Sequence, residues 1–273
     1  MCVSKIYVMF IGVSTASLYP TQTEDAVEVL AKSGIKNIEI FLEANSEAEL
    51  SFCKVLKDKI DYYDMNVVSI HSFCATFEPF LFSEYKRRSQ DAHLQFIKIC
   101  KAMEYLGASY YTFHGSRKEL CNSSFSYKAY CEIFSNLSHI AKECGGLLAW
   151  ENVSWCQSGE VDFLKKCVQY LDKNDFGFTL DLKQALRSKE KIADYISVMQ
   201  SNLVNVHISD YNDCASCILP GDGIRDFKKI ISMLRDVNYK NALILEVYND
   251  CYETVGQIIE SVKYLEGILK EYE

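Results

Sequence analysis

Proline is scarce in this chain, and long apolar runs are missing. Only three prolines occur among the 273 residues, Pro20, Pro79 and Pro220, and each falls in a segment that we expect to be a loop. No apolar run approaches the roughly 20 residues of a membrane-spanning helix. We also expect no signal peptide, because the apolar segment 7–13 is short and strand-like. These absences predict a cytoplasmic protein that does not bind membranes.

A surplus of basic residues is missing as well. The formal net charge at pH 7 is −8, whereas a general nucleic-acid surface needs a basic face, so we expect no nucleic-acid partner. Cysteine, by contrast, is plentiful, but the 12 cysteines are scattered and several fall inside expected helices or strands. This pattern favours a reduced protein over a disulfide scaffold. The close pair Cys214 and Cys217 is interpreted as two free thiols in a loop.

Strand-like and helix-like segments alternate along the chain. The expected strands cover residues 5–13, 37–43, 67–73, 108–116, 147–153, 176–182, 203–209 and 242–248. The expected helices lie near residues 23–33, 47–64, 84–105, 124–143, 160–172, 189–200, 226–236 and 254–271. Eight successive strand–helix units in a chain of this length predict a (β/α)8 TIM barrel. No linker or low-complexity segment interrupts them, so we expect a single domain over residues 1–273.

A doubly wound open sheet is the alternative fold. Such a sheet ordinarily carries a glycine-rich phosphate-binding turn after its first strand. Here the corresponding segment, 12–20, has no such fingerprint. The pattern therefore favours the barrel.

Four of the apolar strand-like runs each carry one ionisable residue near the end: Glu151, Asp181, His207 and Glu246. A charge inside a buried strand is costly unless it is paired or binds a metal. The carboxyl ends of barrel strands meet at one face, so we expect these four side chains to share a site. Three carboxylates and one imidazole suit a divalent cation such as Mn, Mg, Co or Zn. The alternative is a buried ion network without metal.

Short motifs at the expected strand ends carry a family resemblance across nearly the whole chain. They are Ile70-His71, Phe113-His114-Gly115, Trp150-Glu151-Asn152, Leu180-Asp181, Val206-His207-Ile208-Ser209-Asp210, Gly221-Asp222-Gly223 with Asp226-Phe227, and Leu245-Glu246. In this order they resemble the xylose isomerase-like TIM-barrel superfamily, and in particular its sugar phosphate isomerase/epimerase family.

The resemblance implies a metal-dependent sugar or sugar phosphate isomerase/epimerase. In ketose epimerases of this superfamily, one divalent metal is held by side chains that match Glu151, Asp181, His207 and Glu246. Glu151 and Glu246 would also be the catalytic acid/base pair, which moves a proton next to a carbonyl through an enediolate. The implied partner is a small-molecule sugar. Dimers and tetramers are common among similar proteins, so a homo-oligomer is a further possibility.

Two departures from the family pattern bear on the alternatives. Gln184 takes the place of a histidine that helps many relatives hold the substrate, although its amide can still bind a hydroxyl. No histidine stands shortly before Gly221 and Gly223. His71 and His114 match two ligands of the endonuclease IV branch, but these departures weigh against its trinuclear zinc site. A keto-cyclitol dehydratase, which shares the enediolate step, and a non-catalytic sugar-binding barrel stay open.

Further side chains are expected around the same site. His71 and His114 would contact substrate hydroxyls, or else pair only with neighbouring carboxylates. Lys183 could offset negative charge or bind a substrate phosphate, and Trp155 would form a wall for the sugar or simply pack. The aromatic segment 73–82 predicts a lid or a subunit contact.

Two carboxylates flank the end of the second expected strand, Glu39 and Glu43. Glu43 either reaches the mouth of the barrel or lies on the surface. In the loop before the seventh helix, Asp226 is a candidate N-cap.

Overall fold

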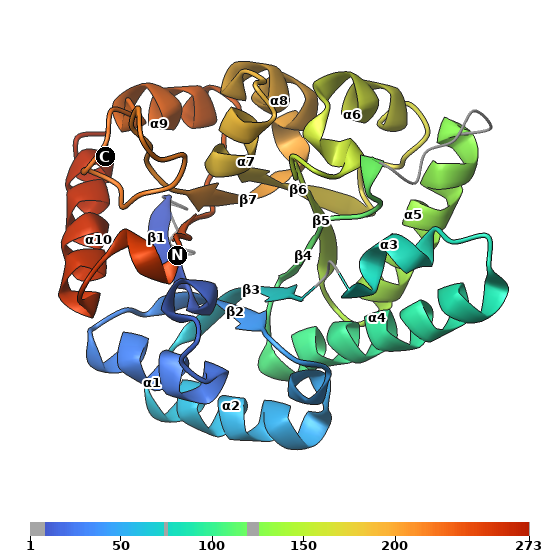
Figure 1. The fold of residues 1–273 in the computed structure, drawn as a ribbon, viewed down its shortest axis with the longest axis horizontal. Helices are drawn as coiled ribbons and strands as arrows, with labels where there is room; N and C mark the ends of the chain where they lie inside the picture. Colours follow the sequence, from blue (N-terminus) through green and yellow to red (C-terminus); the bar gives the residue numbers. More distant parts are fainter. Residues whose placement is uncertain (1–8, 74–75, 119–125, 273) are drawn as a thin grey trace, which may run out of the picture.

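Eight parallel strands pair in chain order, and β1 pairs with β8 to close the ring (Figure 1). The computed structural model describes residues 9–73, 76–118 and 126–272. The strands are β1 (Phe10–Ser14), β2 (Asn37–Leu42), β3 (Asn66–Ser72), β4 (Tyr110–Phe113), β5 (Leu147–Glu151), β6 (Phe176–Asp181), β7 (Leu203–Ile208) and β8 (Ala242–Leu245). The expected (β/α)8 barrel is therefore confirmed.

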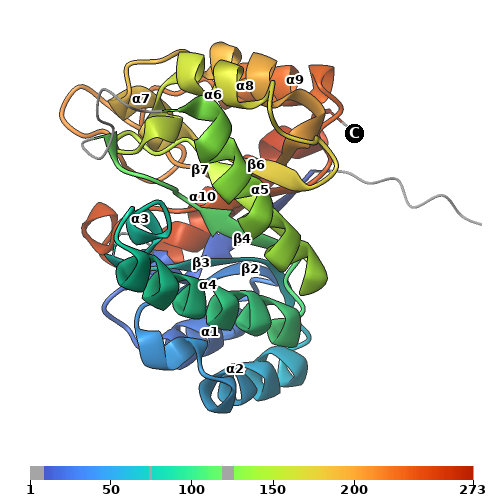
Figure 2. The same ribbon diagram turned by 90° about the vertical axis from the view of Figure 1, so that its right-hand side faces the viewer.

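The α-helices lie around the outside of this ring (Figure 1). They are α1 (Thr23–Lys32), α2 (Leu50–Tyr62), α3 (Glu78–Leu81), α4 (Lys86–Leu106), α5 (Tyr127–Glu143), α6 (Val161–Cys167), α7 (Leu182–Arg187), α8 (Ile192–Met199), α9 (Phe227–Asp236) and α10 (Val255–Lys270). Two of them were not expected, α3 and α7, which follow β3 and β6. Figure 2 shows both at the same end of the barrel, where the strands end. Residues 5–8, 74–75 and 124–125 of the expected elements lie outside the described part of the chain.

Alternation along each strand separates the outer core from the barrel interior. In β2, Ile38, Ile40 and Leu42 join the main apolar cluster, and each is fully buried. Glu39 points to the other face and reaches His207 on β7. Successive side chains of a strand point to opposite faces, so one strand supplies both the packing under the helices and a polar group inside the ring.

The barrel interior changes character from one end to the other. A small separate cluster of Val68, Ala242 and Ile244, with Phe10 and Tyr110 packed against it, fills the interior near the strand beginnings. Polar and ionisable side chains occupy the interior toward the strand ends. The active sites of barrel enzymes lie at that second end, so the sequence-predicted residues are in the place where catalytic groups are found.

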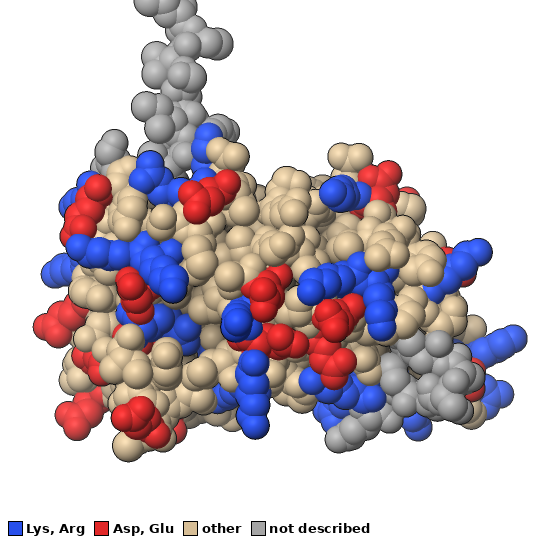
Figure 3. All heavy atoms as spheres, turned by 90° about the horizontal axis from the view of Figure 1, so that it is seen from above, with Lys and Arg blue, Asp and Glu red and all other residues tan. Residues whose placement is uncertain are grey.

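The outer surface carries charges of both signs. On the face in Figure 3, Lys and Arg side chains are interspersed with Asp and Glu, and no continuous basic stripe runs across that face. Among the residues that the structure describes, no helix has the length and apolar character that crossing a membrane requires.

Candidate active site

The four strand-end residues converge at the mouth of the barrel. Glu151 ends β5, Asp181 ends β6, His207 is the penultimate residue of β7, and Glu246 directly follows β8. One ligand atom from each lies within 4.8 Å of the others, and all four side chains are buried. The structure therefore brings together the full set that the sequence predicts.

The two ring nitrogens of His207 face different partners. Nδ1 lies 3.1 Å from Glu151 Oε1, 3.6 Å from Glu246 Oε2 and 3.8 Å from Asp181 Oδ2. Nε2 lies 3.0 Å from Glu39 Oε2. Burial alone would lower the pKa of His207, but the surrounding carboxylates, Glu39 first, hold that pKa well above its usual value.

Lys183 brings a buried positive charge to the cluster. Its Nζ atom lies 3.0 Å from Glu246 Oε2, 3.7 Å from Asp181 Oδ2 and 4.7 Å from the centre of the Tyr248 ring. Burial opposes both charges. Attraction to Glu246 and Asp181 nevertheless raises the pKa of Lys183 well above its usual value, and attraction to Lys183, His207 and His71 lowers the pKa of Glu246 well below its own. Part of the negative charge at the mouth is thus offset by the chain itself.

His71 and His114 bridge the two glutamates of the cluster. His114 Nε2 lies 2.7 Å from Glu151 Oε2 and 2.9 Å from His71 Nε2, and His71 Nδ1 lies 3.6 Å from Glu246 Oε1. Burial alone would raise the pKa of Glu151, but His114 and His207 together, through their charges and hydrogen bonds, hold that pKa well below its usual value. His71, His114 and Glu151 form a second group whose potential ligand atoms meet within 4.8 Å.

Local hydrogen bonds fix the direction of Asp181. Its Oδ1 atom accepts from the backbone N–H of Gln184 at 2.7 Å and caps the N-terminus of α7, which leaves Oδ2 facing His207. The Asn152 side chain accepts from the Asp181 N–H at 2.7 Å and donates to its carbonyl at 3.0 Å. The side-chain oxygen of Gln184 accepts from the hydroxyl of Ser154 at 2.7 Å. Gln184 is therefore held at the mouth by the loop after β5.

A pocket of about 340 Å³ opens over the cluster, within the size range of small-molecule sites. Its lining residues are Ala16, Tyr19, Phe41, Glu43, His71, His114, Glu151, Lys183, Gln184, Glu246, Val247, Tyr248 and Asn249. Glu43 thus reaches the mouth. It is half-buried, and burial together with the nearby charge of Glu47 raises its pKa to about 7. Trp155 lies beside the pocket and packs edge-on against His114, with ring centroids 5.4 Å apart.

Two buried carboxyl groups at this end were not predicted to belong to the site: Glu39, which was expected only to flank the end of its strand, and Glu78, which was not singled out. Glu39 is interior rather than at the strand end, and the signal was its place between isoleucines in an alternating strand. Glu78 of α3 is fully buried, accepts from the Tyr111 hydroxyl at 2.8 Å, and accepts from the backbone N–H of His114 at 2.8 Å. It ties the aromatic segment 73–82 to the loop that carries His114. Movement of that segment as a lid stays a prediction.

The chemistry of the donor set fits a metal ion. Oxygen atoms of three buried carboxylates and one imidazole nitrogen meet closely enough for the four residues to hold a divalent cation. Buried carboxylates repel one another, so a bound cation would offset a repulsion that Lys183 offsets only in part.

Asp226 is confirmed as the N-cap of α9, because its side chain accepts from the backbone N–H of Lys229 at 3.0 Å.

Comparison with solved structures finds the same barrel in several sugar-processing enzymes. A D-tagatose 3-epimerase-like protein matches with a TM-score of 0.80 and 17% identity, covering 96% of this chain and 97% of that one. A 3-keto-D-glucoside 4-epimerase from E. coli matches with a TM-score of 0.75 and 15% identity, over 95% and 99% of the two chains. A D-psicose 3-epimerase from Clostridium cellulolyticum H10 matches with a TM-score of 0.74 and 16% identity, over 96% and 99%. At these identities the likeness is one of fold.

No curated protein is significantly similar to this chain in sequence. A family model described as the xylose isomerase-like TIM barrel matches residues 27–268, which is most of the chain. The chain therefore belongs to the xylose isomerase-like TIM-barrel family.

Proposed function

We propose that this protein is a divalent-metal-dependent isomerase or epimerase of a sugar or sugar phosphate, which moves a proton next to a carbonyl group. The observation that carries the proposal is the convergence of Glu151, Asp181, His207 and Glu246 beneath an open pocket. Epimerases that share the fold support it. Mn, Mg, Co and Zn are the candidate ions, because oxygen donors with one imidazole suit hard to borderline cations.

Glu151 and Glu246 would act as the acid/base pair. They come from β5 and from the end of β8, and both lie close to His71, at 3.8 Å and 3.6 Å. One glutamate removes the proton next to the carbonyl and leaves an enediolate, and the other returns a proton to the opposite face or to the adjacent carbon. When bound, the metal ion would supply Lewis-acid stabilisation of the negative charge.

The remaining side chains of the mouth orient the substrate. His71, His114, Lys183 and Gln184 line the pocket and offer nitrogen donors to substrate oxygens. Trp155 would form a wall beside His114. The substrate would bind in this pocket as an open-chain sugar. If the sugar carries a phosphate group, that group would pair with Lys183.

Metal content tests the proposal first. Protein purified without chelator should carry about one divalent ion per chain, because one four-residue centre is proposed. Asp181→Ala should lose that ion, whereas Asp175→Ala, an aspartate paired with Lys142 away from the mouth, should keep it. Little metal in the wild type, with none taken up on addition, would contradict the proposal.

The reaction is then sought by incubating the loaded enzyme with ketoses and ketose phosphates in heavy water. Deuterium appearing next to the carbonyl, together with an epimer or isomer, is the expected result. Deuterium with loss of water from a keto-cyclitol would indicate a dehydratase instead. Ligand affinity without exchange would indicate a sugar-binding barrel.

The second group of potential metal ligands, His71, His114 and Glu151, favours one other candidate function, a phosphodiesterase that uses several metal ions. The metal content per chain tests this candidate as well. About three ions per chain and cleavage of an abasic DNA duplex would favour that reaction. We expect neither, because the histidines that complete such a centre in relatives are replaced here.

A further inference from the structure

Glu39 lies inside the barrel, directly beneath the proposed metal centre. Its side chain is fully buried, and its Oε2 atom lies 3.0 Å from Nε2 of His207. A register shift between Ile38 and Glu39 in the pairing of β2 with β3 accompanies this placement. A carboxylate in this position is costly to bury unless it serves a partner, and His207 is the ionisable partner closest to it.

The contacts of His207 divide between its two ring nitrogens. Nδ1 faces the three carboxylates of the cluster, at 3.1–3.8 Å. Nε2 faces Glu39 on the opposite side of the ring. A histidine can bind a metal only through a nitrogen that carries no proton, and the hydrogen bond made by the other nitrogen decides which one that is. A carboxylate at Nε2 keeps the proton there and leaves Nδ1 available to the centre.

Three further donors hold Glu39 in place. Its Oε2 atom accepts from the hydroxyl of Ser69 at 2.6 Å, from the hydroxyl of Thr112 at 3.1 Å and from the side-chain amide of Asn205 at 3.3 Å. These donors come from β3, β4 and β7. Among the described residues, no hydrogen bond reaches the second oxygen, Oε1. The hydrogen bonds thus converge on the oxygen that faces His207, which fixes the carboxylate and, through it, the imidazole ring.

We propose that Glu39 is a positioning residue that holds His207 with Nδ1 turned to the metal ion. The proposal rests on the metal centre of the proposed function. Glu39 itself would not contact the metal. Its side chain acts through His207, and its loss should weaken metal binding as well as catalysis.

The variant Glu39→Gln tests this role with little change of shape. The amide oxygen can replace Oε2 and keep the three donors, while the amide NH2 takes the place of Oε1, to which no described residue donates a hydrogen bond. The charge that retains the proton on Nε2 is lost. Glu47→Gln is the matched control, because Glu47 is also a buried carboxylate, hydrogen-bonded to Thr23 and lying outside the cluster.

Co²⁺ affinity, measured by calorimetry on each purified protein, is the main readout. We expect about a 10–100-fold loss for Glu39→Gln, the usual effect of removing a partner of a ligating histidine. Glu47→Gln should bind like the wild type. The visible absorption of bound Co²⁺ should also change in Glu39→Gln, because the His207 ligand is less well oriented. Urea unfolding of the metal-free proteins shows whether both variants are folded.

A second pair of proteins separates positioning from a direct or general effect. In a His207→Gln background, the imidazole through which Glu39 acts is gone, so adding Glu39→Gln should cost little further affinity. The same fold-loss in both backgrounds would overturn the proposal, since Glu39 would then act as a ligand itself, beside His71 and Glu246, or through the fold. Unchanged affinity in Glu39→Gln would overturn it as well. A wild type that binds no Co²⁺ would instead overturn the metal centre and, with it, this role.

Discussion

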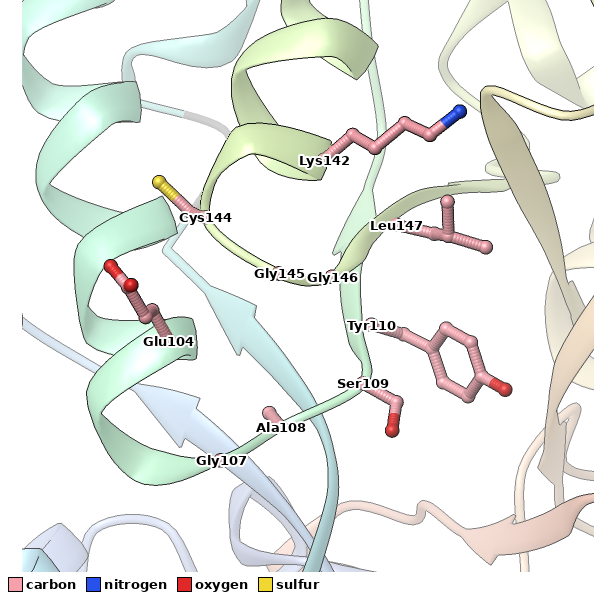
Figure 4. Close-up of a pocket in the computed structure, with 10 residues that line it drawn as sticks. All are labelled: Glu104, Gly107, Ala108, Ser109, Tyr110, Lys142, Cys144, Gly145, Gly146 and Leu147. Atoms are coloured by element: carbon pink, nitrogen blue, oxygen red, sulfur yellow. The ribbon is translucent and has the colours of Figure 1, made fainter.

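The two ends of the barrel differ in what their pockets contain. The base carries a pocket of about 490 Å³ between the beginnings of β4 and β5, larger than the one of about 340 Å³ at the mouth. Figure 4 shows Glu104 and Lys142 on opposite sides of it. Lys142 pairs with Asp175, outside that pocket. At the mouth, by contrast, carboxylates and histidines meet within a few ångströms. Convergence of ionisable groups, and not volume, distinguishes the candidate site.

Three glycines, Gly107, Gly145 and Gly146, line the pocket at the base. Gly107 and Gly145 adopt φ values of +75° and +78°, which turn the chain from α4 into β4 and from α5 into β5. At the base, therefore, the distinctive residues are glycines that form turns, whereas at the mouth they are ionisable side chains. Substitutions at the base should change stability, whereas substitutions at the mouth should change chemistry.

Glu246→Gln should show the largest effect at the mouth. The amide keeps the shape but cannot accept the substrate proton, so exchange of the proton next to the carbonyl should fall about 10²–10⁴-fold. The measurement is deuterium incorporation into a ketose substrate by the metal-loaded protein. An exchange rate equal to that of the wild type would remove Glu246 from the mechanism.

Lys183→Met should destabilise the metal-free protein by about 3–5 kcal/mol, because it removes the buried lysine charge that faces the carboxylates of Glu246 and Asp181. The matched substitution elsewhere is Lys142→Met. Its pair with Asp175 has the lysine side chain 50% exposed, so the loss should be at most about 1 kcal/mol. The free energy of urea unfolding measures both. Equal losses for the two lysines would show that burial at the mouth carries no special electrostatic cost.

The same contrast shows what the sequence can reveal about such a site. Residues at strand ends are predictable from apolar runs, and for this reason Glu151, Asp181, His207 and Glu246 were found together. Distances across the ring are not predictable in this way. Glu39 and His207 are 168 residues apart and meet because the barrel closes and the pairing register shifts beside Glu39. No local pattern contains that information.

Segments between strands were predicted less well, for a related reason. The short helix α7 begins directly after Asp181, whose side chain caps it. The sequence shows an apolar run followed by a polar stretch, and the cap becomes evident only when Asp181 and the Gln184 N–H are seen to meet. In the same way, the burial of Glu78 depends on its contact with the loop after β4.

Gly146→Ala tests the base of the barrel, where a substitution should lower stability and leave the chemistry unchanged. A methyl group there would approach the Met103 side chain at 2.6 Å and the carbonyl oxygen of Ser109 at 3.1 Å. Met103 is fully buried, so the crowding should cost about 1–3 kcal/mol of unfolding free energy. Metal affinity and exchange rate per folded molecule should stay at wild-type values. A loss of metal affinity in this variant would mean that the two ends of the barrel are coupled.

Glu43→Gln, at the mouth of the barrel, should have the smallest effect, a change in how the free energy of unfolding depends on pH. The pKa of Glu43 is raised from 4.5 to about 7, so the folded state holds its proton more tightly than the unfolded state does. The stability that this provides is complete below about pH 4.5 and is lost as the pH rises through about 7. Glutamine does not titrate. Between these pH values the free energy of unfolding of the wild type should therefore fall by about 1 kcal/mol relative to that of the variant. This figure is reduced because solvent screens a half-buried group.

Urea unfolding of the metal-free wild type and Glu43→Gln at several pH values measures this difference, and an NMR titration of the Glu43 carboxyl group measures its cause. A titration midpoint near 7 would show that a negative charge on Glu43, at the rim of the mouth, is unfavourable. A midpoint near 4.5, with parallel stability curves, would mean that the electrostatic cost is confined to the buried cluster. The boundary between the charged mouth and ordinary surface would then lie inside the pocket, between Glu43 and His71.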